Sequence, residues 1–193
     1  MEYAGFWRRF GAYWLDLLIM SPLFIVSTWG NNSFRLFQLY YFIPGLLFGL
    51  WFHVYLVKRY GATPGKLLLK IKISKIDGTD VGYKEAFLRY SVLFIFGIFL
   101  AYSLIPVVVN MSDELYFSMT YRERLHYTMQ NVPSWRSYVE ILMQIWIWSE
   151  FIVMLTNKKK RALHDYIAST IVVKNDKSKV EHESFNNSLE INA

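Results

Sequence analysis

Four long apolar blocks, separated by polar and charged segments, dominate the pattern of the chain. They cover residues 10–28, 37–57, 87–109 and 138–156. A bilayer core of about 30 Å takes roughly 17 to 25 helical residues, so each block is long enough to cross it. The apolar residues fill these blocks and do not recur at amphipathic spacing. The pattern predicts an all-α membrane protein, a four-helix transmembrane bundle whose membrane domain covers residues 1–173.

Composition supports this class. The chain has 193 residues, of which 54% are hydrophobic and 19% aromatic, and it contains no Cys. Disulfides, thiolate metal sites and Cys nucleophiles are therefore excluded. A net charge of +6 would suggest a nucleic-acid partner in a soluble protein, but here the cations border membrane spans and anionic lipid explains them. The first block is too long for a cleavable signal, and no small-residue cleavage pattern follows it.

Lys and Arg are distributed unevenly around the four blocks. One side, formed by the start of the first block, the connector after the second and the exit of the fourth, carries Arg8, Arg9, Lys58, Arg59, Lys66, Lys70, Lys72, Lys75, Lys84, Lys158, Lys159, Lys160 and Arg161. The other side carries Arg35, Arg122, Arg124 and Arg136. Because cytoplasmic segments are enriched in Lys and Arg, both termini and the connector are expected in the cytoplasm, next to anionic lipid.

The connector between the second and third spans alternates apolar and polar residues over 66–74, which predicts a strand. Asp77-Gly78 then supplies a tight-turn signal. A second β-branched run, residues 170–173, follows the fourth span on the same side. The two runs predict a small cytoplasmic β-hairpin or sheet resting on the helix ends, since two strands alone are marginal in water. The polar residues 174–193 are expected to form a disordered cytoplasmic tail.

The long loop of residues 111–137, between the third and fourth spans, contains a helix signal. Ser112 offers a capping hydroxyl, and Asp113 and Glu114 follow in the first turn. We therefore predict an outer interfacial helix over residues 112–130. It is either a surface helix without a partner or a docking site for a protein or peptide outside the cytoplasm.

Every span contributes one charged or titratable side chain near its cytoplasmic end: Asp16, His53, Arg89 and Glu150. At 1.5 Å per residue they lie within roughly 3 to 9 Å of that edge. An Asp at the centre of a span costs roughly 2.5 to 3.5 kcal/mol, so Asp16 needs an explanation. One is an ion site, with Arg89 as fixed cation, Asp16 and Glu150 as anions and His53 changing charge near neutral pH. The other is hydrogen bonding between helices, with edge residues reaching water.

Further polar candidates lie at the two ends of the fourth span. Glu140 and Gln144, one turn apart, either extend a polar route toward the other side or bond a neighbouring helix. His164, next to Asp165, is a secondary candidate for a functional polar site. We also expect an ion pair between Arg9, at the start of the first helix, and Asp165, after the fourth, because it would join the first and last helices at the cytoplasmic rim.

Two motifs suggest enzymatic chemistry but lack the residues that it needs. Residues 61–66 resemble a phosphate-binding loop, yet one residue is missing between the glycines and Leu67 stands where Ser or Thr is required. A turn leaving the second helix explains this segment better. His164-Asp165 suggests a catalytic pair, but neighbours on a helix do not face each other and no nucleophile accompanies them. We therefore expect no enzyme activity, cofactor or metal site.

Several of these segments, taken in order, resemble the RDD-domain family of bacterial integral membrane proteins, named for one Arg and two Asp. The resemblance is carried by residues 5–16, 61–66, 77–78, 88–90, 161–165 and 167–173. The family's Arg corresponds to Arg9, its first Asp to Asp16 and its second to Asp165. The chain departs from the pattern at residues 168–170, Ala-Ser-Thr in place of Ala-Gly-Thr, and in its long outer loop. The resemblance implies a multi-pass protein of the bacterial cytoplasmic (inner) membrane, with transport the usual suggestion and sodium/proton exchange attributed to some members.

Two functional classes remain open. In the first, the protein is a transporter component that moves protons or a cation through Asp16, Glu150 and His53. In the second, it is a non-enzymatic adaptor or assembly subunit that binds another protein through the outer loop or the cytoplasmic hairpin. Acids at matching depth favour the first class. Four spans without internal repeats favour the second, or require a homo-oligomer for the first.

Overall fold

A computed structural model describes residues 2–175, and four of its helical segments are long and apolar enough to cross a membrane. They are Phe6–Ser33, Phe37–Leu68, Tyr83–Asn110 and Trp135–Thr156. The predicted fold of four apolar helices with a small sheet is confirmed. Each segment extends past the predicted span at one or both ends, because helical hydrogen bonding continues into flanking residues such as Arg8 and Arg9, which hydropathy excludes.

The first span is one helix, α1 (Phe6–Ser33), and the last is α9 (Trp135–Thr156). The second consists of α2 (Phe37–Leu50), a π-helical turn η1 (Trp51–Tyr55), α3 (Leu56–Tyr60) and α4 (Pro64–Leu68). The third joins α5 (Tyr83–Tyr102) to α6 (Ile105–Asn110). The remaining elements are α7 (Asp113–Ser118), α8 (Tyr121–Asn131), α10 (Leu163–Ile167) and the strands β1 (Ile71–Lys75) and β2 (Thr170–Lys174).

The strand predicted over residues 66–74 begins too early, because residues 64–68 form the short helix α4. Gly61 ends α3 with φ +72°, and Pro64 then opens α4 at its first position, where its fixed φ suits a helix. Lys70, with φ +53°, turns the chain out of this helix into β1. The local start signal at Pro64 therefore overrides the alternation of apolar and polar residues.

β1 and β2 pair antiparallel with Ile73 opposite Val172, as the two runs predict. Ile71, Ile73 and Val172 are at most 1% exposed, and they pack with Ala12 of α1 in one apolar core. The backbone N–H of Ala4 donates to the carbonyl of Val172 (2.9 Å), so the start of the chain joins the sheet. The sheet is therefore fastened to the ends of the helices.

The predicted turn at Asp77-Gly78 is confirmed. Gly78 has φ +87°, and the N–H of Lys75 donates to the carbonyl of Thr79 (2.9 Å) across the turn. The tail predicted over residues 174–193 begins too early, because Lys174 is the last residue of β2. Residues 176–193 lie outside the described part of the chain.

The single helix predicted over residues 112–130 is wrong, since two helices, α7 and α8, occupy this segment. Ser112 caps α7 as expected, accepting from the N–H of Leu115 (3.2 Å). A second start signal follows, because Thr120 and Glu123 form a capping box in which each side chain bonds the other's backbone N–H. This box restarts the helix and places a break at Met119.

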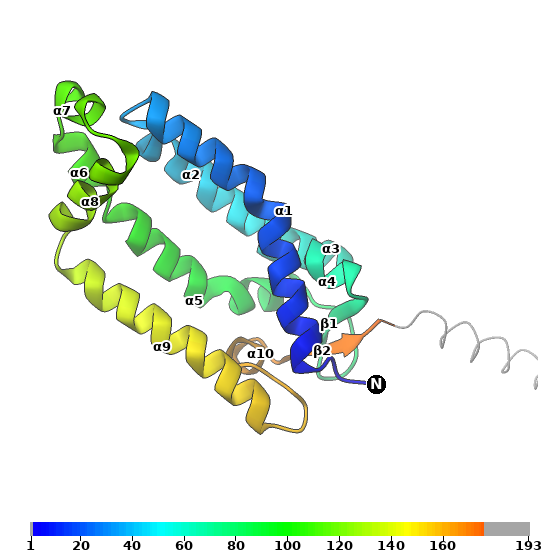
Figure 1. Ribbon diagram of the computed structural model, residues 1–193. Coiled ribbons are helices and arrows are strands. Elements are labelled where there is room, and N and C mark those ends of the chain that lie inside the picture. The colour runs from blue at the N-terminus through cyan, green and yellow to red at the C-terminus, as the bar shows by residue number, and fades with distance from the viewer. Residues whose placement is uncertain (1, 176–193) are drawn as a thin grey trace, which may run out of the picture.

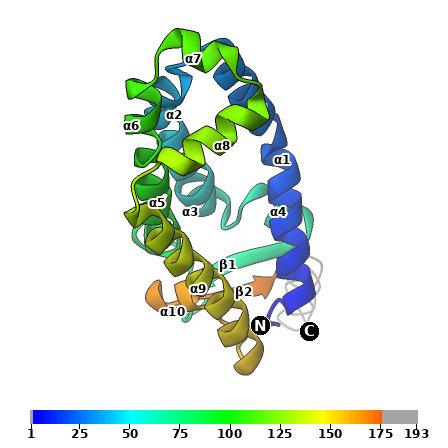
Figure 2. The same ribbon diagram turned by 60° about the vertical axis from the view of Figure 1, so that its left-hand side comes forward.

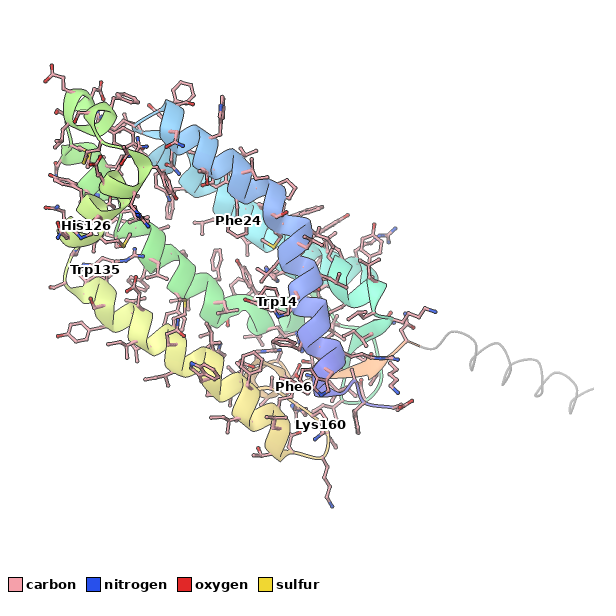
Figure 3. All side chains as sticks on the ribbon, viewed as in Figure 1. Phe6, Trp14, Phe24, His126, Trp135 and Lys160 are labelled. Carbon is pink, nitrogen blue, oxygen red and sulfur yellow. The ribbon has the colours of Figure 1, made fainter. Side chains whose placement is uncertain are left out.

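The sheet and α10 lie at one end of the helices, and α6, α7 and α8 lie at the other (Figures 1 and 2). We call these the sheet end and the far end. Figure 3 shows Phe6 and Lys160 near the sheet end, and His126 and Trp135 near the far end. α1 packs against α4 and α2, and α9 packs against α5. Large apolar side chains are exposed along all four spans, as lipid contact requires.

Candidate functional site: two polar clusters at the sheet end

The first cluster surrounds the fully buried carboxylate of Asp165, in the first turn of α10. Arg9 Nη1 donates to Oδ2 (2.8 Å), and Arg89 Nη1 binds the other oxygen, Oδ1. The N–H of Ala162 donates to Oδ2 (3.0 Å) and the hydroxyl of Thr170 to Oδ1 (3.3 Å). One carboxylate thus joins α1, α5, α10 and β2. We call these residues, together with His164 and Glu150, the Asp165 cluster.

Burial by itself would raise the pKa of Asp165. The positive charge of Arg89, then that of Arg9, and the hydrogen bond from the Ala162 amide act in the opposite direction and prevail. The pKa of Asp165 is held far below its usual range, so this carboxylate is an anion at any pH near neutrality. It is suited to fixing arginines in place and unsuited to exchanging protons.

His164 links the cluster to the fourth span. Its Nδ1 lies 2.6 Å from Glu150 Oε2, and its backbone N–H donates to Glu150 Oε1 (3.0 Å). Its Nε2 lies 2.9 Å from Nη2 of Arg89. Because a guanidinium only donates, this geometry requires a neutral ring whose Nε2 accepts from Arg89 and whose proton is on Nδ1. Nδ1 is close to Glu150 Oε2 but not aligned for a hydrogen bond, and Oε2 has no hydrogen-bond partner within the described residues. The His164 side chain is 29% exposed and that of Glu150 14%, so water reaches the cluster here.

The second cluster holds α4 against α1. Asp16 accepts from the hydroxyl of Thr63 (2.6 Å) and from the backbone N–H of Gly65 (2.7 Å). Lys66 Nζ lies 4.0 Å from Asp16 Oδ2 and donates to Thr63 Oγ1 (3.2 Å). A Cβ atom at Gly65 would lie 2.3 Å from the carbonyl oxygen of Ala12, so α4 touches the backbone of α1 directly. We call this set the Asp16 cluster.

The expected ion pair between Arg9 and Asp165 is present, although Arg9 shares the carboxylate with Arg89. The sequence predicts Arg89 as the fixed cation of one cluster that contains Asp16 and Glu150. Arg89 instead contacts Asp165, Thr170 and His164, so that Asp16 and Glu150 belong to different clusters. The cause is a tertiary contact: α10 folds back under α5 and places a buried anion beside Arg89. Sequence spacing alone gives no sign of it.

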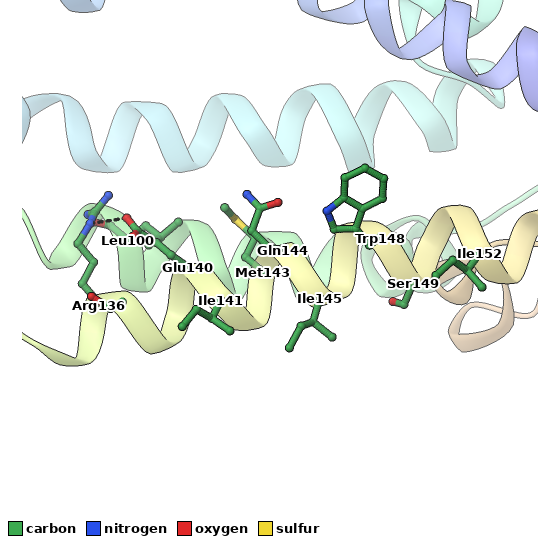
Figure 4. A pocket seen from close by; sticks show the side chains of 11 residues that line it. Leu100, Arg136, Glu140, Ile141, Met143, Gln144, Ile145, Trp148, Ser149 and Ile152 are labelled. Atoms are coloured by element: carbon green, nitrogen blue, oxygen red, sulfur yellow. Dashed lines mark hydrogen bonds and ion pairs between the residues drawn. The ribbon is translucent and has the colours of Figure 1, made fainter.

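Other candidates lie elsewhere. The His53 ring stacks on Tyr90 with centroids 4.5 Å apart, and within the described residues it forms no ion pair with Asp16 or Glu150. Arg136 Nε pairs with Glu140 Oε1 (2.7 Å) on α9. Glu140 and Gln144 line a cavity of about 860 Å³ beside α9, whose other walls are mostly apolar. In Figure 4 Gln144 points to the opposite side of α9 from Ile145.

Sequence reasoning did not find Thr63, Lys66 and Thr170 as members of these clusters. A signal existed for the first two, because they belong to the loop of residues 61–66 that resembles an anion-binding loop. That loop does bind an anion, the carboxylate of Asp16, through the N–H of Gly65 near the start of α4. His164 was only a secondary candidate, and its contact with Glu150 makes it central to the Asp165 cluster.

A family model described as the RDD family matches residues 3–169. The chain belongs to the RDD family. Comparison with curated proteins gives no match, and neither does comparison with solved structures. In this RDD protein the match contains all four apolar helices and most of both clusters, and it ends one residue before β2. The family and the four apolar helices together indicate a multi-pass membrane protein.

Proposed function

We propose that this RDD protein is a transporter component that exchanges protons, alone or against a cation, at the pair of Glu150 and His164. The observation that carries the proposal is the position of His164, between an acid of the fourth span and an arginine of the third. Histidine is the side chain that most readily changes charge near neutral pH. Because the His164 side chain is partly exposed, protons from water can reach it, whereas Asp165 and its arginine partners are buried in ion pairs.

The geometry suggests how a proton would act. A proton that reaches Nε2 of His164 removes the lone pair that accepts from Arg89, and places two cationic groups 2.9 Å apart. The ring then passes its Nδ1 proton to Glu150, which becomes neutral and loses its attraction for the ring. Because Glu150 lies on α9 and Arg89 on α5, each transfer changes the contact between two packed spans.

We assign a holding role to Asp16. Its carboxylate accepts from two fixed donors, Thr63 and Gly65, and has Lys66 nearby, so it is bound by the turn that leads into α4. A transported ion would have to displace these contacts. The polar residues of α9, Glu140 and Gln144, support a route that continues from Glu150 toward the far end along the cavity.

Flux measurements test the proposal. In proteoliposomes with imposed sodium, potassium and proton gradients, the wild-type protein should move protons or a cation. His164→Asn and Glu150→Gln should each reduce the flux by about 100-fold, the lower range for loss of a proton-transferring group. His126→Asn is the matched control, because His126 is exposed on α8 at the far end. Absence of flux in wild type, or an equal loss in the control, would contradict the proposal.

We further propose that the sheet end faces the cytoplasm of a bacterial inner membrane, which the distribution of Lys and Arg supports. The chain lacks Cys, so single-Cys reporters need no background removal. In intact cells an impermeant thiol reagent should label Cys at the exposed positions Ser33 and Ser118, and leave Thr79 and Lys84 unlabelled until the cells are permeabilised. Labelling of Thr79 or Lys84 in intact cells would reverse this orientation.

A second candidate function is that of an adaptor or assembly subunit. It is favoured by the exposed amide of Gln144 on α9, a span whose other exposed residues, such as Ile141 and Ile145, are mostly apolar and suit lipid. Gln144 has no hydrogen bond within the described residues, and a polar group within a span favours contact with another helix. Purification in mild detergent distinguishes the two functions, since a stoichiometric foreign subunit supports the adaptor and a homo-oligomer supports the transporter.

A further inference from the structure

Arg124 is a buried cation whose side-chain contacts within residues 2–175 are with neutral groups. It lies on α8 at the far end and is only 8% exposed. Its Nη2 donates to the side-chain oxygen of Asn32 (2.6 Å), and its Cζ lies 4.2 Å from the centre of the Tyr116 ring. Both partners are neutral, and no ion pair with Arg124 occurs within residues 2–175. Taking a guanidinium out of water is costly unless an anion compensates its charge.

The other buried or half-buried arginines at this end have acids. Arg35 pairs with Asp113, and its Nη1 also donates to the carbonyl of Val108 (2.7 Å). Arg136 pairs with Glu140 (2.7 Å). Arg124 is more buried than either of them, and no carboxylate of the described residues pairs with it. The difference points to an anion that comes from outside the chain.

Arg124 also lines a cavity of about 120 Å³. Its polar lining consists of Asn31, Gln38, Tyr116, Tyr121, Arg124 and Thr128, and it contains no acid. The Asn31 amide already donates to Ser27 and the Tyr116 hydroxyl to the carbonyl of Asn31, so the neutral side chains left to donate to an anion are those of Gln38, Tyr121 and Thr128. Most of the five N–H donors of Arg124 are not used by Asn32. The volume equals about four waters, which suits a phosphate or carboxylate group and is too small for a whole cofactor.

We propose that this cavity, the Arg124 site, binds a phosphate or carboxylate group. Arginine recognises both through paired, charge-assisted hydrogen bonds. The cavity lies where α1 ends and α2 begins, which is the level of lipid headgroups if these helices span the bilayer. The group is therefore supplied by an anionic phospholipid or by a small anion in the surrounding water. This site lies at the opposite end from the Asp165 cluster and does not depend on transport.

The test uses the full chain in an uncharged detergent, with phosphatidylglycerol, inorganic phosphate and acetate as separate probes. Thermal stability and lipid retention by native mass spectrometry are measured against probe concentration. Arg124→Gln should bind the effective probe at least fivefold more weakly than wild type. Arg122→Gln is the matched control, since Arg122 is exposed on the same helix and the charge change is identical. This control should bind like wild type.

The probes distinguish the sources. Stabilisation by phosphate or acetate without lipid supports a soluble anion, and stabilisation by phosphatidylglycerol alone supports a headgroup. If Arg124→Gln does not fold, Thr128→Val decides, because it changes the lining and keeps Arg124 in place. Weaker binding in this folded variant supports the site. The proposal is overturned if no probe binds, if Arg124→Gln or a folded Thr128→Val binds like wild type, or if Arg122→Gln loses as much binding as Arg124→Gln.

Discussion

Replacing Asp165 with Asn is expected to lower the free energy of unfolding by about 3 to 5 kcal/mol, the range for removing one partner of a buried ion pair. Asp165 is fully buried and is the anion shared by Arg9 and Arg89. The amide would leave two guanidinium groups without a carboxylate. Unfolding by SDS in mixed micelles, followed by circular dichroism, measures the change.

A double-mutant cycle shows whether the loss comes from the ion pairs. Arg89→Gln combined with Asp165→Asn should cost less than the sum of the two single changes, because the second change removes a charge that the first has already left unpaired. Asp113→Asn is the control: this acid also binds an arginine, but its side chain is 71% exposed, and exposed pairs contribute little. Additive costs, or an equal loss in the control, would exclude Asp165 as the central anion.

The pKa of Asp165 sets the pH range in which this carboxylate contributes to the free energy of unfolding. Because the pKa is lowered on folding, the stabilisation is fully present above the unfolded value, about 3.9. It is lost only as the pH falls through the folded value, which lies still lower. In a His164→Asn background, where the neighbouring histidine 3.7 Å away does not titrate, the difference in stability that Asp165→Asn produces should therefore stay constant from pH 8 to pH 5.

The four spans could be predicted because their signal is the length of an apolar run, which needs no knowledge of neighbours. The contact between Arg9 and Asp165 could be predicted because both flank spans on the same side. The partner of Arg89 could not, since it depends on how α10 folds back beneath α5. The break at Met119 had a local signal, Thr120 followed by Glu123, but the loose apolar pattern around it favoured one continuous helix.

The loop of residues 61–66 shows a different limit of sequence reasoning. The loop resembles a phosphate-binding loop but lacks residues that a nucleotide site needs. The same physical feature, backbone N–H groups at the start of a helix, serves here to bind a carboxylate of the chain itself, that of Asp16. The motif therefore identified the chemistry, anion binding, while the identity of the anion required the packing of α4 on α1.

Gly65→Ala is expected to lower the free energy of unfolding by about 3 kcal/mol or more, since overpacking a core costs roughly 1 to 3 and losing a charged hydrogen bond roughly 1.5 to 3. The new Cβ would lie 2.3 Å from the carbonyl oxygen of Ala12 and 2.8 Å from the amide nitrogen of Asp16. Both are backbone atoms of α1, so no side-chain rotation relieves the contact. The helices must separate, which breaks the bond from the Gly65 N–H to Asp16.

The sign of the stability change distinguishes a steric clash from helix propensity. Gly65 lies within α4, and Ala is favoured over Gly in a helix by up to about 1 kcal/mol, so without a clash the variant would be more stable. Gly97→Ala is the matched control: a Cβ on Gly97, within α5, would meet no atom within 4 Å. Thermal unfolding in detergent should show Gly97→Ala equal to or more stable than wild type, and Gly65→Ala clearly less stable. A stable Gly65→Ala protein would mean that α4 does not press on α1 and that Asp16 lacks the partners assigned to it here.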